Sequence, residues 1–147
     1  MHKLVPPFLF LFSVIGMFVL SRFYPIQEWV KTPYNLLGIV PFSLGLFILI
    51  STLTRYRKTK TEINTFKKPK KLITNGFFQY SRNPIYLGFT LILLGIALLL
   101  GNVAALIPVA CFFLAANFWY VPFEEKNMEI VFGKNYLFYK KKVRRWI

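Results

Sequence analysis

The sequence from residue 85 to residue 121 reads IYLGFTLILLGIALLLGNVAALIPVACFFLAANFWYV and contains no charged side chain. Two apolar blocks, 85–100 and 103–121, are separated by Gly101-Asn102, a dipeptide typical of turns. The blocks therefore predict a tight hairpin of two membrane-spanning helices. At about 1.5 Å per residue the first helix spans roughly 24 Å, which is short of a hydrocarbon core of about 30 Å. We expect this helix to begin within the membrane interface or the bilayer to be thin there.

Two further apolar blocks precede the hairpin, at about 4–20 and 34–53. The first resembles a signal peptide but lacks a small-x-small cleavage pattern, so we interpret it as a retained span. Pro41 and Gly45 interrupt the second, as membrane helices tolerate. Hydrophobic residues make up 56% of the chain and charged residues only 16%, whereas a soluble domain carries about a quarter charged residues. The expected fold is all-α, a polytopic membrane protein with about four transmembrane helices forming a single domain over 1–147.

The formal net charge of +14 is gathered between and after the apolar blocks. The loop 54–84 and the tail 122–147 are strongly basic, whereas the connection between the first two spans holds only Arg22 and Lys31 and the hairpin turn has no basic residue. By the positive-inside rule, both termini, the loop and the tail are expected in the cytosol, facing anionic membrane lipids. The expected location is the plasma (inner) membrane of a prokaryote. A nucleic-acid partner is not expected. The basic residues of these two segments are Arg55, Arg57, Lys58, Lys60, Lys67, Lys68, Lys70 and Lys71, and Lys126, Lys134, Lys140, Lys141, Lys142, Arg144 and Arg145.

After the last span, Pro122 suits the first turn of a new helix, which we expect to be amphipathic, cytosolic and ended or bent at Gly133. No metal site is expected. The chain has one histidine, His2, at its start and one cysteine, Cys111, inside an apolar block.

Chemistry is most plausible around Arg82-Asn83-Pro84. A structural interpretation is available, since Asn is a favoured N-cap and Pro a favoured first helical residue. A functional interpretation uses the same geometry. The helix start offers free backbone donors, and Arg82 adds a fork of donors suited to a carboxylate or phosphate. Asn75-Gly76 permits a tight turn that could bring backbone close to a ligand.

Glu124 and Glu125 are two of only five acids in the chain and directly follow the last apolar span. Acids in the first turn of a helix favour its dipole, which is a sufficient structural reason for them. Acids at a membrane margin are also costly unless they are paired or hydrated. They could therefore hold a cation, or pair with Arg82 or a loop lysine.

Taken together, these motifs resemble a known family. Arg82-Asn83-Pro84-Ile85-Tyr86-Leu87-Gly88, the hairpin, and then Glu124-Glu125 are similar to the signature of integral membrane methyltransferases. These are the isoprenylcysteine carboxyl methyltransferase and phospholipid methyltransferase families. The segment 132–147, with Phe132-Gly133 and a basic end that contains tryptophan, resembles the family tail. The resemblance covers about residues 72–147.

The resemblance implies S-adenosyl-L-methionine as methyl donor and a lipid, isoprenylated or other hydrophobic substrate that enters from the bilayer. It also implies which residues line the cofactor pocket: Leu72, Ile73, Gly76, Phe78, Arg82, Asn83, Pro84, Tyr86, Leu87, Glu124 and Glu125. Among these, Arg82 and Glu124 are expected to take the catalytic roles. Arg82 suits the cofactor carboxylate, and either glutamate suits its ammonium or its ribose hydroxyls.

The methylated atom stays open between a carboxyl oxygen and an amine nitrogen. A carboxylate nucleophile needs no base, whereas an amine must lose a proton, which gives a glutamate a role. Asn83 stands where the family pattern has histidine, and asparagine cannot titrate. The alternative from a different class is a cofactor-free membrane scaffold or permeation protein.

Overall fold

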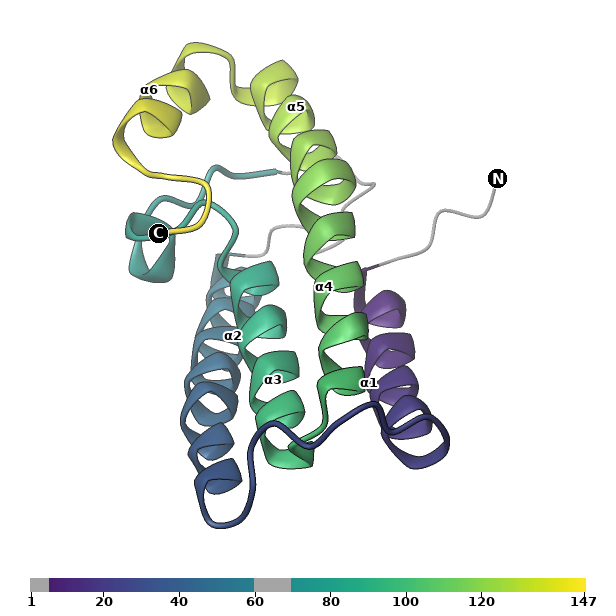
Figure 1. Cartoon of the computed structure of the whole chain (residues 1–147). Helices are drawn as coiled ribbons and strands as arrows, with labels where there is room; N and C mark the ends of the chain where they lie inside the picture. The colour runs from purple at the N-terminus through teal and green to yellow at the C-terminus, as the bar shows by residue number, and fades with distance from the viewer. Residues whose placement is uncertain (1–5, 60–69) are drawn as a thin grey trace.

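A computed structural model describes residues 6–59 and 70–147 of the chain. Four helices lie side by side in the order α2, α3, α4, α1, so the first two helices of the chain are separated by the hairpin (Figure 1). Among the described residues there is no β-strand, only one isolated bridge between Glu28 and Asn102. The all-α polytopic fold is thus confirmed. The helices of the bundle are α1 (Pro6–Phe23), α2 (Ile39–Thr59) with the 3-10 turn η1 (Tyr34–Gly38) before it, α3 (Pro84–Leu100), and α4 (Leu106–Ala115) after η3 (Val103–Ala105).

Three helical stretches are long and apolar enough to cross a membrane, Pro6–Phe23, Tyr34–Thr59 and Val103–Phe132, and Pro84–Leu100 is a shorter apolar helix. The shortness of the third helix agrees with the sequence. The predicted first span begins before residue 6, and Lys60, Lys67 and Lys68 belong to the predicted basic loop; these positions lie outside the described residues.

The helix expected to have Pro122 in its first turn is present, but no loop separates it from the last span. α4 continues through a π-helical turn, η4 (Ala116–Tyr120), into α5 (Val121–Phe132) without a break. In the π turn, the Val121 N–H donates to the carbonyl of Ala116 instead of the residue four positions back. Proline removes one such bond from a helix, and here it follows a turn in which the regular pattern is already interrupted. Gly133 (φ 50°) then ends α5 as predicted, and α6 (Lys134–Lys142) follows.

Four glycines bring α3 into close contact with α2 and with the η1 turn before it. Gly38 faces Gly95, and Gly45 faces Gly88, so that the two helices run antiparallel with almost touching backbones. A Cβ added at Gly45 would lie 2.6 Å from the carbonyl oxygen of Gly88, closer than side-chain carbons pack. Small residues at a helix interface permit this approach in membranes. The two helices therefore form a tightly packed pair.

At the end of the bundle where α3 turns into α4, the loop after α1 is hydrogen-bonded to the turn. Trp29 donates its N–H to the carbonyl of Gly101 at 2.9 Å, and Val103 donates to that of Gln27 at 2.9 Å. Gly101 adopts φ +65°, a conformation that glycine reaches without strain. The predicted Gly101-Asn102 turn is therefore confirmed.

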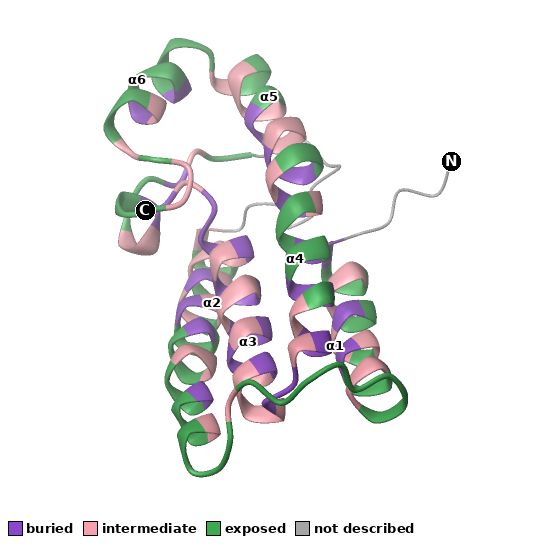
Figure 2. Ribbon diagram, in the orientation of Figure 1, coloured by how far each residue is buried: buried purple, intermediate pink, exposed green. Residues whose placement is uncertain are grey.

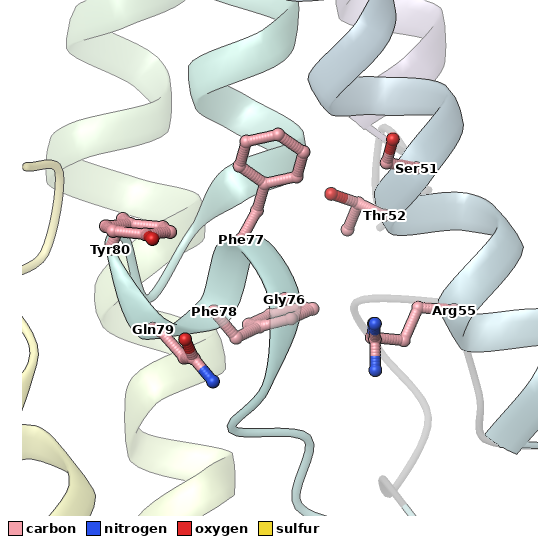
Figure 3. A pocket seen from close by; sticks show the side chains of 8 residues that line it. All are labelled: Ser51, Thr52, Arg55, Gly76, Phe77, Phe78, Gln79 and Tyr80. Atoms are coloured by element: carbon pink, nitrogen blue, oxygen red, sulfur yellow. The ribbon is translucent and has the colours of Figure 1, made fainter.

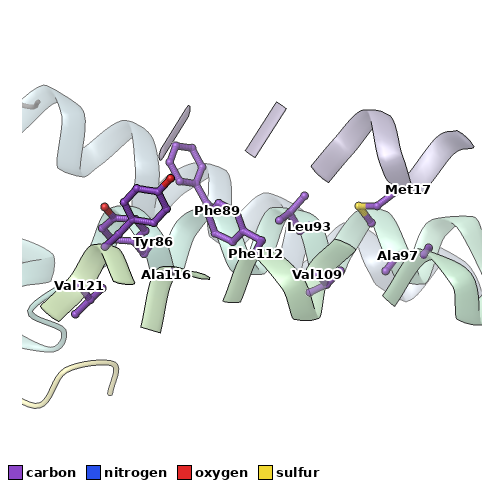
Figure 4. Packing of buried hydrophobic residues seen from close by; sticks show 11 residues of the cluster. Met17, Tyr86, Phe89, Leu93, Ala97, Val109, Phe112, Ala116 and Val121 are labelled. Atoms are coloured by element: carbon purple, nitrogen blue, oxygen red, sulfur yellow. The ribbon is translucent and has the colours of Figure 1, made fainter. Parts of the chain in front are cut away.

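Buried residues form two clusters. The larger one fills the space between α1, α3 and α4 around Leu93 and Phe112 (Figure 4). The smaller one contains Ile73, Phe78, Tyr136 and Tyr139 and joins the segment before α3 to α6. Large apolar side chains remain exposed along α1 and α2, as a bilayer-facing surface requires (Figure 2). The predicted site residues lie at the end of the bundle where α3 and α5 begin (Figure 1).

Candidate functional site

The expected site residues come from three parts of the chain: the segment 72–83, the first turn of α3 and the first turn of α5. A fourth part, α6 with the C-terminal residues, folds back over them (Figure 1). Sequence reasoning did not assign this last part to the site.

Arg82 is held by the carboxylate of Glu125. Its Nε and Nη2 donate to Oε1 of Glu125 at 3.1 and 2.8 Å, and Nη1 donates to the carbonyls of Lys140 and Val143, both at 2.9 Å. The two side chains are only 9% and 5% exposed. An arginine has five N–H donors, and four hydrogen bonds already engage this one. Arg82 therefore serves first to join α3, α5 and α6.

Two further cationic side chains lie near Glu125, and one of them also pairs with Glu129. Arg145 Nη2 lies 3.0 Å from Oε2 of Glu125, and Lys140 pairs with Glu129 at 2.5 Å while its Nζ is 3.8 Å from Glu125. Three cationic side chains thus surround two carboxylates, so this ion network carries a net positive charge. Sequence reasoning treated Lys140 and Arg145 only as topology signals, because charge counts do not show which basic residue folds back.

The backbone of the C-terminal residues is also hydrogen-bonded to residues 81–83. Arg82 N donates to the carbonyl of Arg144 at 3.0 Å, and Ser81 Oγ and Asn83 Nδ2 donate to that of Arg145 at 3.2 and 3.1 Å. Asn83 occupies the N-cap position with Pro84 next, as predicted, but its side chain makes no capping bond. Its amide holds the tail instead.

Tyr86 and Glu124 form a second polar pair. The Tyr86 hydroxyl donates to Oε1 of Glu124 at 2.7 Å, and its ring stacks on Tyr120 with centroids 6.2 Å apart. Tyr120 is the last residue of the π turn, which sets the direction of the residues after it. Glu124 also lies close enough to the Tyr56 hydroxyl of α2 for the two groups to interact electrostatically. Glu124 is half-buried, whereas Glu125 is buried.

Leu72, Ile73 and Phe78 lie in the smaller hydrophobic cluster. The carbonyl of Phe78 accepts a 2.7 Å hydrogen bond from the Tyr139 hydroxyl. Burial raises the pKa of both Tyr136 and Tyr139 above its ordinary value. Leu72, Ile73 and Phe78 therefore anchor the segment before α3 to α6. Pro84 is buried and Leu87 half-buried in the first turn of α3.

A cavity of about 360 Å³ lies beside this network, between α2 and the 3-10 turn η2 (Gly76–Gln79), as Figure 3 shows. Its lining residues are Ser51, Thr52, Arg55, Gly76, Phe77, Phe78, Gln79 and Tyr80. Of the expected pocket residues only Gly76 and Phe78 line it. The structure thus brings Arg82, Asn83, Tyr86, Glu124 and Glu125 together at the polar network and leaves the other predicted residues in the hydrophobic cluster, at the cavity or in the first turn of α3.

Comparison with known proteins agrees with the resemblance. A sequence model described as phospholipid methyltransferase matches residues 34–135. An uncharacterized protein of Haemophilus influenzae is 44% identical over 63 residues, which are 43% of this chain and the whole of that protein. No solved structure matches.

Proposed function

The chain belongs to the phospholipid methyltransferase family, and on that premise we propose that it transfers a methyl group from S-adenosylmethionine to a lipid or other hydrophobic acceptor at one membrane face. When bound, the cofactor supplies an electrophilic methyl group on a sulfonium. The protein must hold the cofactor's charged groups, exclude water and align the acceptor, because in-line transfer depends mainly on alignment and desolvation.

The Tyr86–Glu124 pair carries this proposal. The helix that contains Glu124 runs for 30 residues from Val103, about 45 Å, which exceeds a hydrocarbon core of about 30 Å. Counted from Val103, the hydrocarbon ends near Pro122, so Glu124 lies at the membrane boundary. A carboxylate fixed there by a phenol suits an ammonium or ribose hydroxyls, while the acceptor remains in the bilayer.

The two neighbouring glutamates therefore receive different roles. Glu125 is engaged by Arg82 and Arg145 and holds the site together. Glu124 is assigned to the ligand. The excess positive charge of the ion network favours the carboxylate of the cofactor nearby. Arg82 acts on that carboxylate through this charge, since most of its donors are already engaged.

The remaining proton chemistry follows from the acceptor. A carboxylate acceptor needs no base, whereas an amine acceptor gives its proton to Glu124, since Asn83 cannot titrate. A cofactor-free scaffold would retain the buried Arg82–Glu125 pair for stability alone. Binding of S-adenosylhomocysteine separates the two functions, since a scaffold has no site for it.

The orientation is also proposed. The end of α2, the start of α3 and α5 lie at the same end of the bundle (Figure 1), and this end carries the basic segments. We assign it to the cytosolic side of a prokaryotic plasma membrane, with both termini there. A reporter enzyme fused after Ile147 tests this assignment, because activity only on the outer side would contradict it.

Calorimetric binding of S-adenosylhomocysteine to the detergent-purified chain tests the cofactor assignment. We expect wild-type binding, and a loss of about ten-fold or more for Glu124→Gln, since a charge-assisted hydrogen bond contributes about 1.5–3 kcal/mol. Glu28→Gln, which removes an exposed carboxylate from the loop after α1, serves as the matched control and should bind normally. Absence of binding to folded wild-type protein at millimolar ligand would reject the proposal. Transfer of labelled methyl groups to a panel of lipids, amines and isoprenylcysteine analogues then identifies the acceptor.

A further inference from the structure

Arg55 lines the cavity between α2 and η2 with most of its donors uncommitted. Within the part of the chain that the structure describes, its guanidinium makes one hydrogen bond, from Nη1 to Oδ1 of Asn75 at 2.8 Å. Arg82, by comparison, makes four side-chain hydrogen bonds. Arg55 is half-buried, and an incompletely paired arginine there is suited to bind an anion.

The guanidinium of Arg55 occupies space that only a glycine at position 76 leaves open. A Cβ added at Gly76 would lie 2.8 Å from Nε of Arg55, and Gly76 adopts φ +68°. Glycine at this position therefore leaves the space that the guanidinium occupies. Figure 3 shows Arg55 reaching from α2 toward Gly76 at the edge of the cavity.

The other polar groups of the cavity are neutral. Ser51 contributes a hydroxyl from α2 and Gln79 an amide from η2, whereas the Thr52 hydroxyl already donates to the carbonyl of Ile48 at 2.7 Å. No acidic side chain is among the lining residues described. A single positive charge with several neutral hydrogen-bonding groups favours a monoanion with many acceptor oxygens. A phosphodiester has this chemistry, and arginine matches its geometry.

The depth of Arg55 indicates a lipid as the source of the phosphate. The helical stretch from Tyr34 to Thr59 has 26 residues, about 39 Å, so its last turn and a half extends beyond a hydrocarbon core of about 30 Å. Arg55 lies in that part, at headgroup level. Phe47 and Ile50 are exposed one to two turns earlier. The Phe47 ring contacts the Phe77 ring of the cavity edge-on, with centroids 5.7 Å apart. Acyl chains can therefore lie along α2 while the phosphate reaches Arg55.

We propose that this cavity is a binding site for the phosphate group of a membrane phospholipid, with Arg55 as its main ligand. The site includes none of the ion network around Glu125, and its occupation requires no methyl donor. It adds a lipid contact to the chain that is separate from the Tyr86–Glu124 pair.

The test measures lipid binding to the full chain in a maltoside detergent without cofactor. The probes are dioctanoyl phosphatidylglycerol, dioctanoylglycerol, which lacks the phosphate, and inorganic phosphate. Arg55→Gln removes the charge, and Arg57→Gln removes an exposed charge from the same helical turn as the matched control. Ser51→Leu fills the cavity without any change of charge. Unfolding temperatures show that each variant is folded, and S-adenosylhomocysteine binding is measured separately.

We expect phosphatidylglycerol to bind the wild type, with the affinity reduced about ten-fold or more in Arg55→Gln. Ser51→Leu should also reduce it, and Arg57→Gln should stay within about two-fold. Equal binding of dioctanoylglycerol, or equal loss in Arg55→Gln and Arg57→Gln, overturns the phosphate site. Inorganic phosphate binding as tightly as the lipid overturns the lipid as its source. Failure of S-adenosylhomocysteine binding alone counts against the methyltransferase assignment and leaves this result intact.

Discussion

The hydroxyl of Tyr86 lies 2.7 Å from the carboxylate of Glu124 and joins the first turn of α3 to the first turn of α5. The next residue along the chain, Glu125, points into a different environment and contacts two arginines. Successive residues of a helix are separated by about 100°, so adjacent acids face different partners. We therefore expect changes at Tyr86 and Glu124 to affect ligand binding, and changes at Glu125 to affect stability.

Tyr86→Phe should reduce cofactor binding more than it reduces stability. The change removes one hydroxyl and leaves the ring stacked on Tyr120. We expect a loss of about 0.5–1.5 kcal/mol in S-adenosylhomocysteine binding, because Glu124 is no longer fixed in direction. Calorimetry and a thermal unfolding curve measure the two quantities on the same preparation. A variant that unfolds earlier yet binds like the wild type would contradict the role given to this pair.

Arg82→Ala and Glu125→Ala should each destabilise the fold strongly. Both side chains are almost fully buried, and removal of one partner leaves a buried charge that costs about 3–5 kcal/mol. The double variant should lose much less stability than the two single variants lose together, because both changes break the same contact. Lys126→Ala removes an exposed charge beside Glu125 and serves as the control. Additive losses in unfolding experiments would show that the two residues act independently.

Much of the fold could be predicted from the sequence, because apolar blocks, turn residues and charge asymmetry are local signals. The short α3, the turn at Gly101 and the end of α5 at Gly133 all follow from them. The helix with Pro122 in its first turn was predicted, whereas its continuity with α4 through a π turn was not, since no local pattern announces that turn. The glycine contacts had a signal that was not used. Gly38 and Gly45 are seven residues apart, as are Gly88 and Gly95, which places each pair on one helix face.

The candidate site could be predicted only in part. Arg82, Asn83, Tyr86 and the glutamates belong to short motifs, so sequence identifies them. Their partners Arg145 and Lys140 lie in a tail whose many cations look alike, and only the folded chain shows that two of them reach Glu125 and Glu129. Arg55 was hidden for the same reason among the basic residues in the last turns of α2 and the loop after it.

Alkaline pH should destabilise the chain through its buried tyrosines. Burial raises the pKa of Tyr139 above its ordinary value of 10.0, so the folded state retains a proton that the unfolded chain releases. The stabilisation is complete below pH 10.0 and is lost as the pH rises above it, by up to about 1.4 kcal/mol per pH unit for one group. Tyr139→Phe should lower stability at pH 8 and make the decline above pH 10 shallower.

Unfolding midpoints measured from pH 8 to pH 11 check the effect of Tyr139. Tyr80→Phe removes an exposed hydroxyl and should follow the wild-type curve. The expectation for Tyr139 fails if its variant declines as steeply as the wild type over the same range.

The glycine contacts between α2 and α3 should tolerate no side chain. Gly45→Ala places a Cβ 2.6 Å from the carbonyl of Gly88, where backbone must move, and overpacking costs about 1–3 kcal/mol. Because α2 carries Arg55 and α3 begins two residues after Arg82, the displacement should also reduce lipid and cofactor binding. Gly16→Ala is the matched control, since its Cβ would meet only Pro108 at an ordinary 3.6 Å. That change should be neutral or slightly stabilising, because alanine favours a helix by about 0.5–1 kcal/mol over glycine. Equal unfolding temperatures for the two variants would mean that α2 and α3 separate at little cost, and the cavity between α2 and η2 would then lack the rigid support that its phosphate site requires.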